Sequence, residues 1–360
     1  MFKMKKTIIK KVITACFLVV FIILTIVSCG MFIDGIDIAQ VDENGKEVYY
    51  AKAGSEIHFT VRGHAECNTT DDKGITGKLI FAMLVPKDWD FANTATVTYK
   101  NDLADNPEEQ MTMSVVPNTS LPKNGNGKTW AQCLTSTYGV GPNVLDDMEW
   151  VVFQTDRTWN ILNNQNPTFT IYIKAKAGSK NLRCKLGFFV DDTDDGFSTD
   201  ERRFKVSYAT ECFEIVGGRG MTIDFCNQHF NKTTPLTSLQ NDFITISFVR
   251  DVAKNNLSSE NQIYLLGEAV TKSGRIYAIS NRDANTLMSR TSSVSSTFSK
   301  TIWPMSYFGV PDGEELDHIN YYFSNADGTV SVTQSDDDFV QEGTPLPVTK
   351  TPFEFKFSCE

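Results

Sequence analysis

The chain contains none of the short motifs that usually carry catalysis or nucleotide binding. There is no G-x-S-x-G, no H-E-x-x-H and no glycine-rich phosphate loop. No C-x-x-C pair occurs, and the four scattered histidines, which we expect at the surface, do not lie at zinc-ligand spacing from a cysteine. The formal net charge is -10, and a negative surface repels nucleic-acid phosphates. We therefore predict a protein that is not an enzyme, needs no cofactor and binds no nucleic acid.

A basic leader precedes a long apolar run at the N-terminus. Five lysines lie before residue 12, and the segment 12–27 carries no charge, which is the layout of a secretory signal. Ile26-Val27-Ser28-Cys29 resembles the bacterial lipobox, in which the cysteine is acylated and the bond before it is cut. We expect a signal peptide over 1–28, a lipidated Cys29 and a short tether over 29–32. The alternative is an uncleaved signal anchor in which Cys29 is idle.

Apolar and polar residues alternate over many short segments. In 57–62 the apolar residues Ile57, Phe59 and Val61 fall on one face, which indicates a half-buried strand. The same pattern recurs in 168–174, 204–208, 243–249, 319–323 and 353–357. Continuous apolar runs at 78–85 and 149–153 are typical of central strands buried on both faces. Because Asn-, Asp- and Gly-rich turns separate these segments, we predict an all-β protein with tandem Ig-like or carbohydrate-binding-module-like β-sandwiches.

One segment predicts a helix. Thr129 is a favourable N-cap and Gly139 a favourable residue beyond the C-terminus. Between them Trp130, Leu134 and Tyr138 fall on one stripe. We expect this short helix in the first domain, at the rim of a sheet.

A glycine-rich segment suggests where the chain divides. Residues 215–225 hold three glycines within four residues, and a new set of predicted strands follows. We predict an N-terminal Ig-like domain over 33–218 and a C-terminal β-sandwich over 222–360. The first is large enough to be one elaborated sandwich or two smaller ones.

The eight cysteines allow disulfides in an exported protein. Cys184 alternates with leucines and is expected to be a buried thiol. Cys226 and Cys359 bracket the second half of the chain and are candidates for a disulfide.

Two acidic segments, 191–196 and 335–339, are expected to be solvated turns. The first also suggests calcium, but it has Thr193 and Arg202 where an EF-hand loop needs oxygen ligands. A looser calcium site is a weak candidate, formed by Asp191, Asp194 and Asp195.

Aromatic residues supply the most useful clue to function. A flat ring on a rigid sheet can stack on the C–H face of a sugar, while neighbouring polar side chains bind its hydroxyls. The second domain offers such rings beside the polar loop 280–286, and Trp89 lies between two aspartates in the first. The candidate carbohydrate-binding residues are Trp303, Tyr307, Tyr322, Tyr277, Asn281, Arg282, Asp283 and Trp89. The alternative is that each ring packs in a core or at a sheet edge.

Several segments resemble an uncharacterised family of Bacteroidetes outer-membrane lipoproteins. They are KLIFAMLVPKDWD (78–90), GKTW (127–130), YGVGPNVLDDMEWVVF (138–153), LRCKLGFFV (182–190), DFITISF (242–248) and INYYFSNADGTV (319–330). The family is similar to accessory proteins encoded beside SusC-like transporters and SusD-like glycan-binding partners. The second domain is similar in layout to the carbohydrate-binding sandwiches of SusE-type proteins. The resemblance implies glycan capture at the cell surface and attaches no catalytic residues.

These expectations combine into one functional hypothesis. The protein is a lipid-anchored outer-membrane lipoprotein at the cell surface that binds polysaccharide or oligosaccharide for a SusC/SusD-type uptake complex. The alternative is a structural or adhesive surface lipoprotein whose Ig-like domains bind protein partners.

Overall fold

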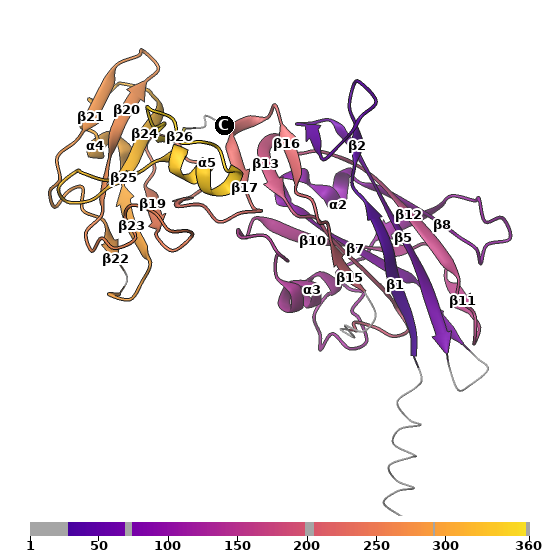
Figure 1. The fold of residues 1–360 in the computed structure, drawn as a ribbon. Helices are drawn as coiled ribbons and strands as arrows, with labels where there is room; N and C mark the ends of the chain where they lie inside the picture. The colour runs from indigo at the N-terminus through magenta and orange to yellow at the C-terminus, as the bar shows by residue number, and fades with distance from the viewer. Residues whose placement is uncertain (1–27, 69–73, 199–204, 291, 358–360) are drawn as a thin grey trace, which may run out of the picture. The chain divides into compact units, whose positions relative to one another are not determined.

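The computed structural model describes residues 28–68, 74–198, 205–290 and 292–357 (Figure 1). The predicted signal peptide therefore lies outside the described residues, except for Ser28. The chain forms two compact units. The first runs to Ser179 and includes Arg183–Gly217, and the second comprises Lys180–Leu182 and the chain from Gly218 onward. The division falls within the glycine-rich segment 215–225.

Nine antiparallel strands form the main sheet of the first unit. In spatial order they are β1 (Ser28–Asp37), β5 (Glu56–Asn68), β12 (Thr168–Lys176), β8 (Thr96–Asn101), β9 (Met111–Val115), β10 (Met148–Thr155), β7 (Leu79–Pro86), β14 (Gly187–Asp192) and β15 (Val206–Tyr208). Although β1 and β14 are far apart in this order, they lie against each other. The sheet therefore curls around a core, and the predicted all-β fold is confirmed.

The hydrophobic pattern explains which strands lie where. In β5, Ile57, Phe59 and Val61 are buried while His58 and Arg62 are exposed, as strict alternation requires. Every residue of β7 is buried, which fits its continuous apolar sequence and its place between β10 and β14.

Short strands and helices complete the first unit. The remaining strands are β2 (Gln40–Val41), β3 (Glu47–Val48), β4 (Tyr50–Lys52), β6 (Ile75–Gly77), β11 (Trp159–Ile161) and β16 (Phe213–Val216). A further strand, β13 (Lys180–Cys184), has its first three residues in the second unit and its last two in the first. The helices are η1 (Lys87–Trp89), α2 (Phe91–Thr94) and α3 (Trp130–Tyr138). The predicted helix α3 is confirmed, with Thr129 as N-cap. Among the described residues, no helix is both long and apolar enough to cross a bilayer.

The second unit contains two sheets. One has the order β18 (Asn231–Thr234), β19 (Ile244–Val249), β23 (Thr297–Ile302) and β22 (Ser289–Arg290). The other has the order β21 (Ile276–Ile279), β20 (Tyr264–Thr271), β24 (Leu316–Ser324) and β25 (Ser331–Val332), with β26 (Phe353–Lys356) also paired to β24. β17 (Arg219–Asp224), α4 (Pro304–Tyr307) and α5 (Gln334–Glu342) complete the described elements of this unit.

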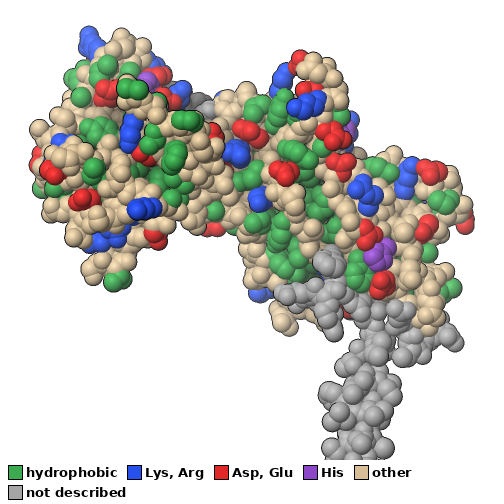
Figure 2. All heavy atoms as spheres, viewed as in Figure 1, with side chains coloured by type: hydrophobic (Ala, Val, Ile, Leu, Met, Phe, Trp, Pro, Cys, Tyr) green, Lys and Arg blue, Asp and Glu red, His purple; other side chains and the backbone are tan. Residues whose placement is uncertain are grey.

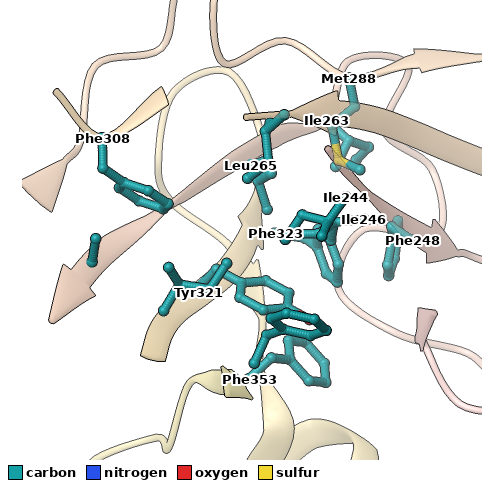
Figure 3. Close-up of a cluster of buried hydrophobic side chains, with 14 of the residues drawn as sticks. Ile244, Ile246, Phe248, Ile263, Leu265, Met288, Phe308, Tyr321, Phe323 and Phe353 are labelled. Atoms are coloured by element: carbon teal, nitrogen blue, oxygen red, sulfur yellow. The ribbon is translucent and has the colours of Figure 1, made fainter. Parts of the chain in front are cut away.

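An aromatic-rich core lies between strands of these two sheets (Figure 3). Ile244, Ile246 and Phe248 of β19 point into it, and they meet Tyr321 and Phe323 of β24. The rings of Phe248 and Phe323 have centroids 4.9 Å apart. Since alternate residues of each strand enter this core, the intervening residues of β19 and β23 point to the opposite face of their sheet.

The acidic segment 335–339 was predicted to be a solvated turn, and this prediction is wrong. The segment is part of helix α5. Asp336 caps its first turn by accepting hydrogen bonds from the backbone N–H (2.9 Å) and the hydroxyl (2.8 Å) of Thr333. Asp337 is buried, where it accepts a hydrogen bond from the backbone N–H of Phe230 at 2.8 Å. The acidic composition concealed a helix because Asp336 and Asp337 bind backbone N–H groups instead of facing water.

The cysteines whose side chains are described fall into two classes. Cys67, Cys212 and Cys226 are disulfide-bonded, and Cys133 and Cys184 are buried thiols. The prediction for Cys184 is thus confirmed. The predicted partner of Cys226, Cys359, lies outside the described residues.

Candidate functional site

A face rich in hydroxyl groups forms the outer side of the sheet β18–β19–β23–β22. Antiparallel register places Thr245 opposite Thr301 and Ser247 opposite Ser299. Their hydroxyl oxygens are 2.8 Å and 2.9 Å apart, so each pair is hydrogen-bonded across the strands. Thr234 of β18 and Ser289 of β22 extend the same row of side chains. We call these six residues the hydroxyl face.

Two exposed aromatic residues lie at one end of the hydroxyl face. Phe243 and Trp303 each stand one position beyond the register pair Ile244 and Ile302. Alternation therefore directs both rings to the outer side, and they are 68% and 42% exposed. Trp303 keeps an extended backbone (φ −95°, ψ 109°), as expected for a residue before proline.

The hydroxyl face carries little charge. The structure describes every residue of the strands β18, β19, β23 and β22. Among their outward-facing positions, one side chain is charged, that of Lys232. Lys300 belongs to β23 but points to the other side, where its ammonium group donates to the Leu287 carbonyl at 3.1 Å. Burial lowers the pKa of Lys300. Acidic and basic side chains are scattered over the molecular surface visible in Figure 2 rather than gathered in one patch.

Tyr307 is not the exposed platform that the sequence suggested. Its hydroxyl donates to the Leu265 carbonyl at 2.7 Å, and its ring packs edge-on against Phe308 with centroids 5.0 Å apart. Burial raises the pKa of Tyr307. The helix α4 turns this residue back toward the core, so only Trp303 of the pair remains exposed.

In the loop 280–286, which was predicted to bind sugar hydroxyls, Arg282 and Asp283 make hydrogen bonds within the protein. Arg282 donates from Nη2 to the Ser324 hydroxyl (3.1 Å) and from Nε to the Asn325 carbonyl (3.2 Å). The Asp283 carboxylate accepts from the backbone N–H of Asn285 at 2.8 Å. Asn281 and Asp283 are exposed, whereas Arg282 is half-buried.

Tyr277 and Tyr322 do not join Trp303 in one site. Tyr277 is half-buried and packs against the core. Tyr322 is half-buried opposite Leu266, on the outer side of the other sheet of the sandwich. The sandwich thus separates Tyr322 from the hydroxyl face.

Trp89, predicted to be a binding residue, is a core residue. It is 1% exposed, lies parallel to Phe59 (centroids 6.4 Å apart) and meets Phe213 edge-on (6.0 Å). The short helix η1 turns its ring inward, while Asp90 remains exposed and Asp88 is half-buried. The prediction of a Trp89 sugar platform is therefore wrong.

The weak calcium candidate is also wrong, because lysines neutralise its carboxylates. Lys205 lies 2.7 Å from Asp191 and 2.9 Å from Asp195, and Lys123 lies 2.6 Å from Asp194. Across the described residues, no group of three or more His, Cys, Asp or Glu side chains could hold a metal ion.

Sequence reasoning missed Phe243 and the hydroxyl pairs. The alternation in residues 243–249 predicts a strand and places Phe243 in phase with Thr245 and Ser247. The pairing of this strand with residues 297–302 could not be predicted, because a single sequence does not show which distant strands pair.

Comparison with known families places the chain in one of them. A family model described as Domain of unknown function (DUF4961) matches residues 32–229. The chain belongs to this family. Beyond the DUF4961 region, a second model, Domain of unknown function (DUF8578), matches residues 231–332 and includes the whole hydroxyl face with Phe243 and Trp303. No curated protein matches the chain.

Solved structures show only distant likeness. The C-terminal domain of the antigen I/II-family protein AspA of Streptococcus pyogenes is 8% identical, with a TM-score of 0.28, over 85% of this chain and 98% of that one. The major pilin subunit BcpA of Bacillus cereus is 9% identical, with a TM-score of 0.22, over 92% of this chain and 67% of that one. Scores this low support no inference about function.

Proposed function

We propose that the protein is a non-catalytic, lipid-anchored surface lipoprotein that binds a neutral glycan on the hydroxyl face. The observation that carries the proposal is the pair of exposed rings, Phe243 and Trp303, at the end of an almost uncharged row of hydroxyl groups. By the family resemblance, the glycan is passed to a SusC/SusD-type uptake complex in the outer membrane.

The chemistry of the face suits a sugar chain. Aromatic rings offer apolar area to sugar C–H groups, and hydroxyl side chains both donate and accept hydrogen bonds. The low charge favours a neutral glycan over an anionic one, and a flat sheet suits an extended chain over a single buried sugar. Weak binding at each molecule is strengthened when many copies on one membrane engage one polysaccharide.

Membrane attachment rests on Cys29. The backbone of Cys29 pairs with that of Cys67 in β1 and β5, whereas its side chain lies outside the described residues. Lipidation forms a thioether at the Cys29 sulfur, and a sulfur in a thioether cannot also form a disulfide. Cys67, whose backbone lies opposite that of Cys29, is disulfide-bonded. Lipidation of Cys29 therefore requires that its own sulfur take no part in a disulfide.

Affinity electrophoresis tests the glycan proposal. The purified full chain should be retarded in gels that contain at least one neutral polysaccharide from a panel of plant, host and microbial glycans. Trp303→Ala should weaken this binding about 5- to 30-fold, because it removes an apolar contact of about 1 to 2 kcal/mol. Phe243→Ala should act in the same direction.

A matched control separates the hydroxyl face from other exposed apolar residues. Ile276 is 59% exposed and lies on β21 of the other sheet, so Ile276→Ala should leave retardation unchanged. Retardation that is equal in wild type, Trp303→Ala and Phe243→Ala would reject this site. Binding to a partner protein without binding to any glycan would favour the adhesive alternative.

A further inference from the structure

Lys205 is buried among carboxylates in the first unit. Its side chain is 3% exposed, and its ammonium nitrogen lies 2.7 Å from Oδ1 of Asp191, whose side chain is fully buried. Asp195 approaches the same nitrogen at 2.9 Å and remains 33% exposed. The backbone N–H of Val190 donates to the Lys205 carbonyl at 2.8 Å, which fixes the end of β14 beside the chain that enters β15.

We propose that Lys205 and Asp191 condense to an intramolecular isopeptide bond between Nζ of Lys205 and Cγ of Asp191. The bond would tie β14 covalently to the residue that precedes β15, the edge strand of the main sheet. This modification is separate from the glycan-binding face and does not depend on it.

The geometry already holds the reacting groups together. The nitrogen and the carboxylate are in contact, so amide formation requires only a small approach of two fixed groups. Both carboxylate oxygens of Asp191 accept backbone hydrogen bonds, Oδ1 from Asp192 and Oδ2 from Ser198, each at 3.0 Å. Such donors stabilise the negative charge that develops on oxygen when an amine attacks the carbon.

Burial opposes the charged form of Lys205, but the carboxylates of Asp191 and Asp195 outweigh it and raise the pKa of Lys205. Conversion of the pair to a neutral amide removes the desolvation cost of both charges. Desolvation raises the pKa of Asp191 to about 7, so its neutral acid form is accessible near neutral pH. Asp192, also buried, has one carboxylate oxygen without a hydrogen-bond partner among the described atoms, and burial raises the pKa of this group too. Two buried acids beside one buried lysine are costly unless charge is removed.

The reaction balances without an external reagent. The ammonium group passes one proton to Asp195, and the resulting amine attacks Cγ of Asp191. A C–N bond forms, and the C–O bond to one carboxyl oxygen breaks. That oxygen leaves as water and takes two protons that were on the lysine nitrogen. One of these protons comes directly from the nitrogen, and the other is returned by Asp195. The ion pair and the amide plus water contain the same atoms and the same net charge.

The surroundings favour loss of water. Phe189, on the same face of β14 as Asp191, stacks on Phe197 with centroids 5.9 Å apart, and Trp130 meets Phe197 edge-on at 6.3 Å. This aromatic cluster adjoins Asp191 along β14, while the partly exposed Asp195 can exchange protons with solvent.

Peptide mapping of the full chain tests the proposal directly. After reduction, alkylation and trypsin digestion, mass spectrometry should find residues 186–202 joined to residues 204–219, lighter than the two peptides together by one water. Trypsin should not cut after Lys205, because the amide removes its positive charge. Recovery of unmodified 186–202 together with cleavage after Lys205 would overturn the proposal, and this result needs no variant that folds.

Variants and an internal control sharpen the test. Lys205→Arg keeps the positive charge but should give only separate peptides, and a joined product in this variant would overturn the assignment. The internal control is Lys123. It contacts Asp194, in the same loop as Asp195, at 2.6 Å, but its side chain is exposed, so it should remain unlinked. A link at Lys123 would mark the joining as an artefact.

Asp195→Asn should lower the linked fraction, and an unchanged fraction would overturn its role as proton carrier.

Discussion

His229 shows how tertiary structure changes the character of a single residue. We expected the histidines at the surface, but His229 is held between Asp224, at 3.1 Å from Nε2, and Asp337, which contacts Nδ1. Burial opposes the charged form of His229, yet the hydrogen bonds and charges of the two carboxylates outweigh it and raise the pKa of His229 to about 9. The charged imidazolium thereby connects helix α5 to the chain near β17.

Stability of the second unit should depend on pH through His229. Because the folded pKa of about 9 exceeds the ordinary value of 6.5, the stabilisation is complete below pH 6.5 and disappears as pH rises through 9. We expect a loss of roughly 2 to 3 kcal/mol across this range, measured as the free energy of unfolding in urea. His229→Gln should flatten the dependence, and the exposed-residue control His58→Gln should not. A dependence that survives in His229→Gln would refute the assignment.

At the scale of elements, helix α3 owes its start to one threonine. The Thr129 hydroxyl accepts from the backbone N–H of Gln132 at 3.2 Å, and the Gln132 side chain accepts from the backbone N–H of Thr129 at 2.9 Å. This reciprocal pair satisfies two backbone N–H groups at the helix N-terminus. The helix packs against β10 through its buried face, which includes Trp130 and Leu134.

Removal of this cap should destabilise the first unit. Thr129→Ala is expected to lower the free energy of unfolding by about 1 kcal/mol, measured by thermal or urea denaturation. Thr135→Ala, at an exposed position inside the same helix, should be neutral or slightly stabilising because alanine is the better helix former. Equal destabilisation by both substitutions would show that the cap is not the cause.

Elements were predictable where their pattern is local. The alternation in 57–62 and the continuous run 78–85 identified β5 and β7, and the Thr129 and Gly139 signals identified α3. Helix α5 was missed, because its apolar residues are few and its buried Asp337 reads as a surface residue. The register of β19 with β23, which creates the hydroxyl face, joins segments some fifty residues apart in sequence.

At the scale of the whole molecule, the proposed membrane attachment depends on one atom, the sulfur of Cys29. Cys29→Ser should move the protein from the membrane fraction to the soluble fraction and abolish incorporation of labelled palmitate. A stable anchor requires more than one acyl chain, so partial acylation would leave protein in both fractions. Non-reduced peptide mapping that finds Cys29 joined to Cys67 would contradict lipidation of that molecule.

The sequence by itself determined the all-β class, the strands with clear alternation, the short capped helix and the export signal expected at the N-terminus. These features depend on residues within a few positions of one another, so local spacing reveals them. Only the tertiary structure decided that Trp89 is buried while Trp303 is exposed. It also decided that the ammonium group of Lys205 contacts two carboxylates of the calcium candidate, and that Phe243 stands opposite Trp303. Each of these depends on which distant segments meet, because burial and charge pairing are properties of the packed chain.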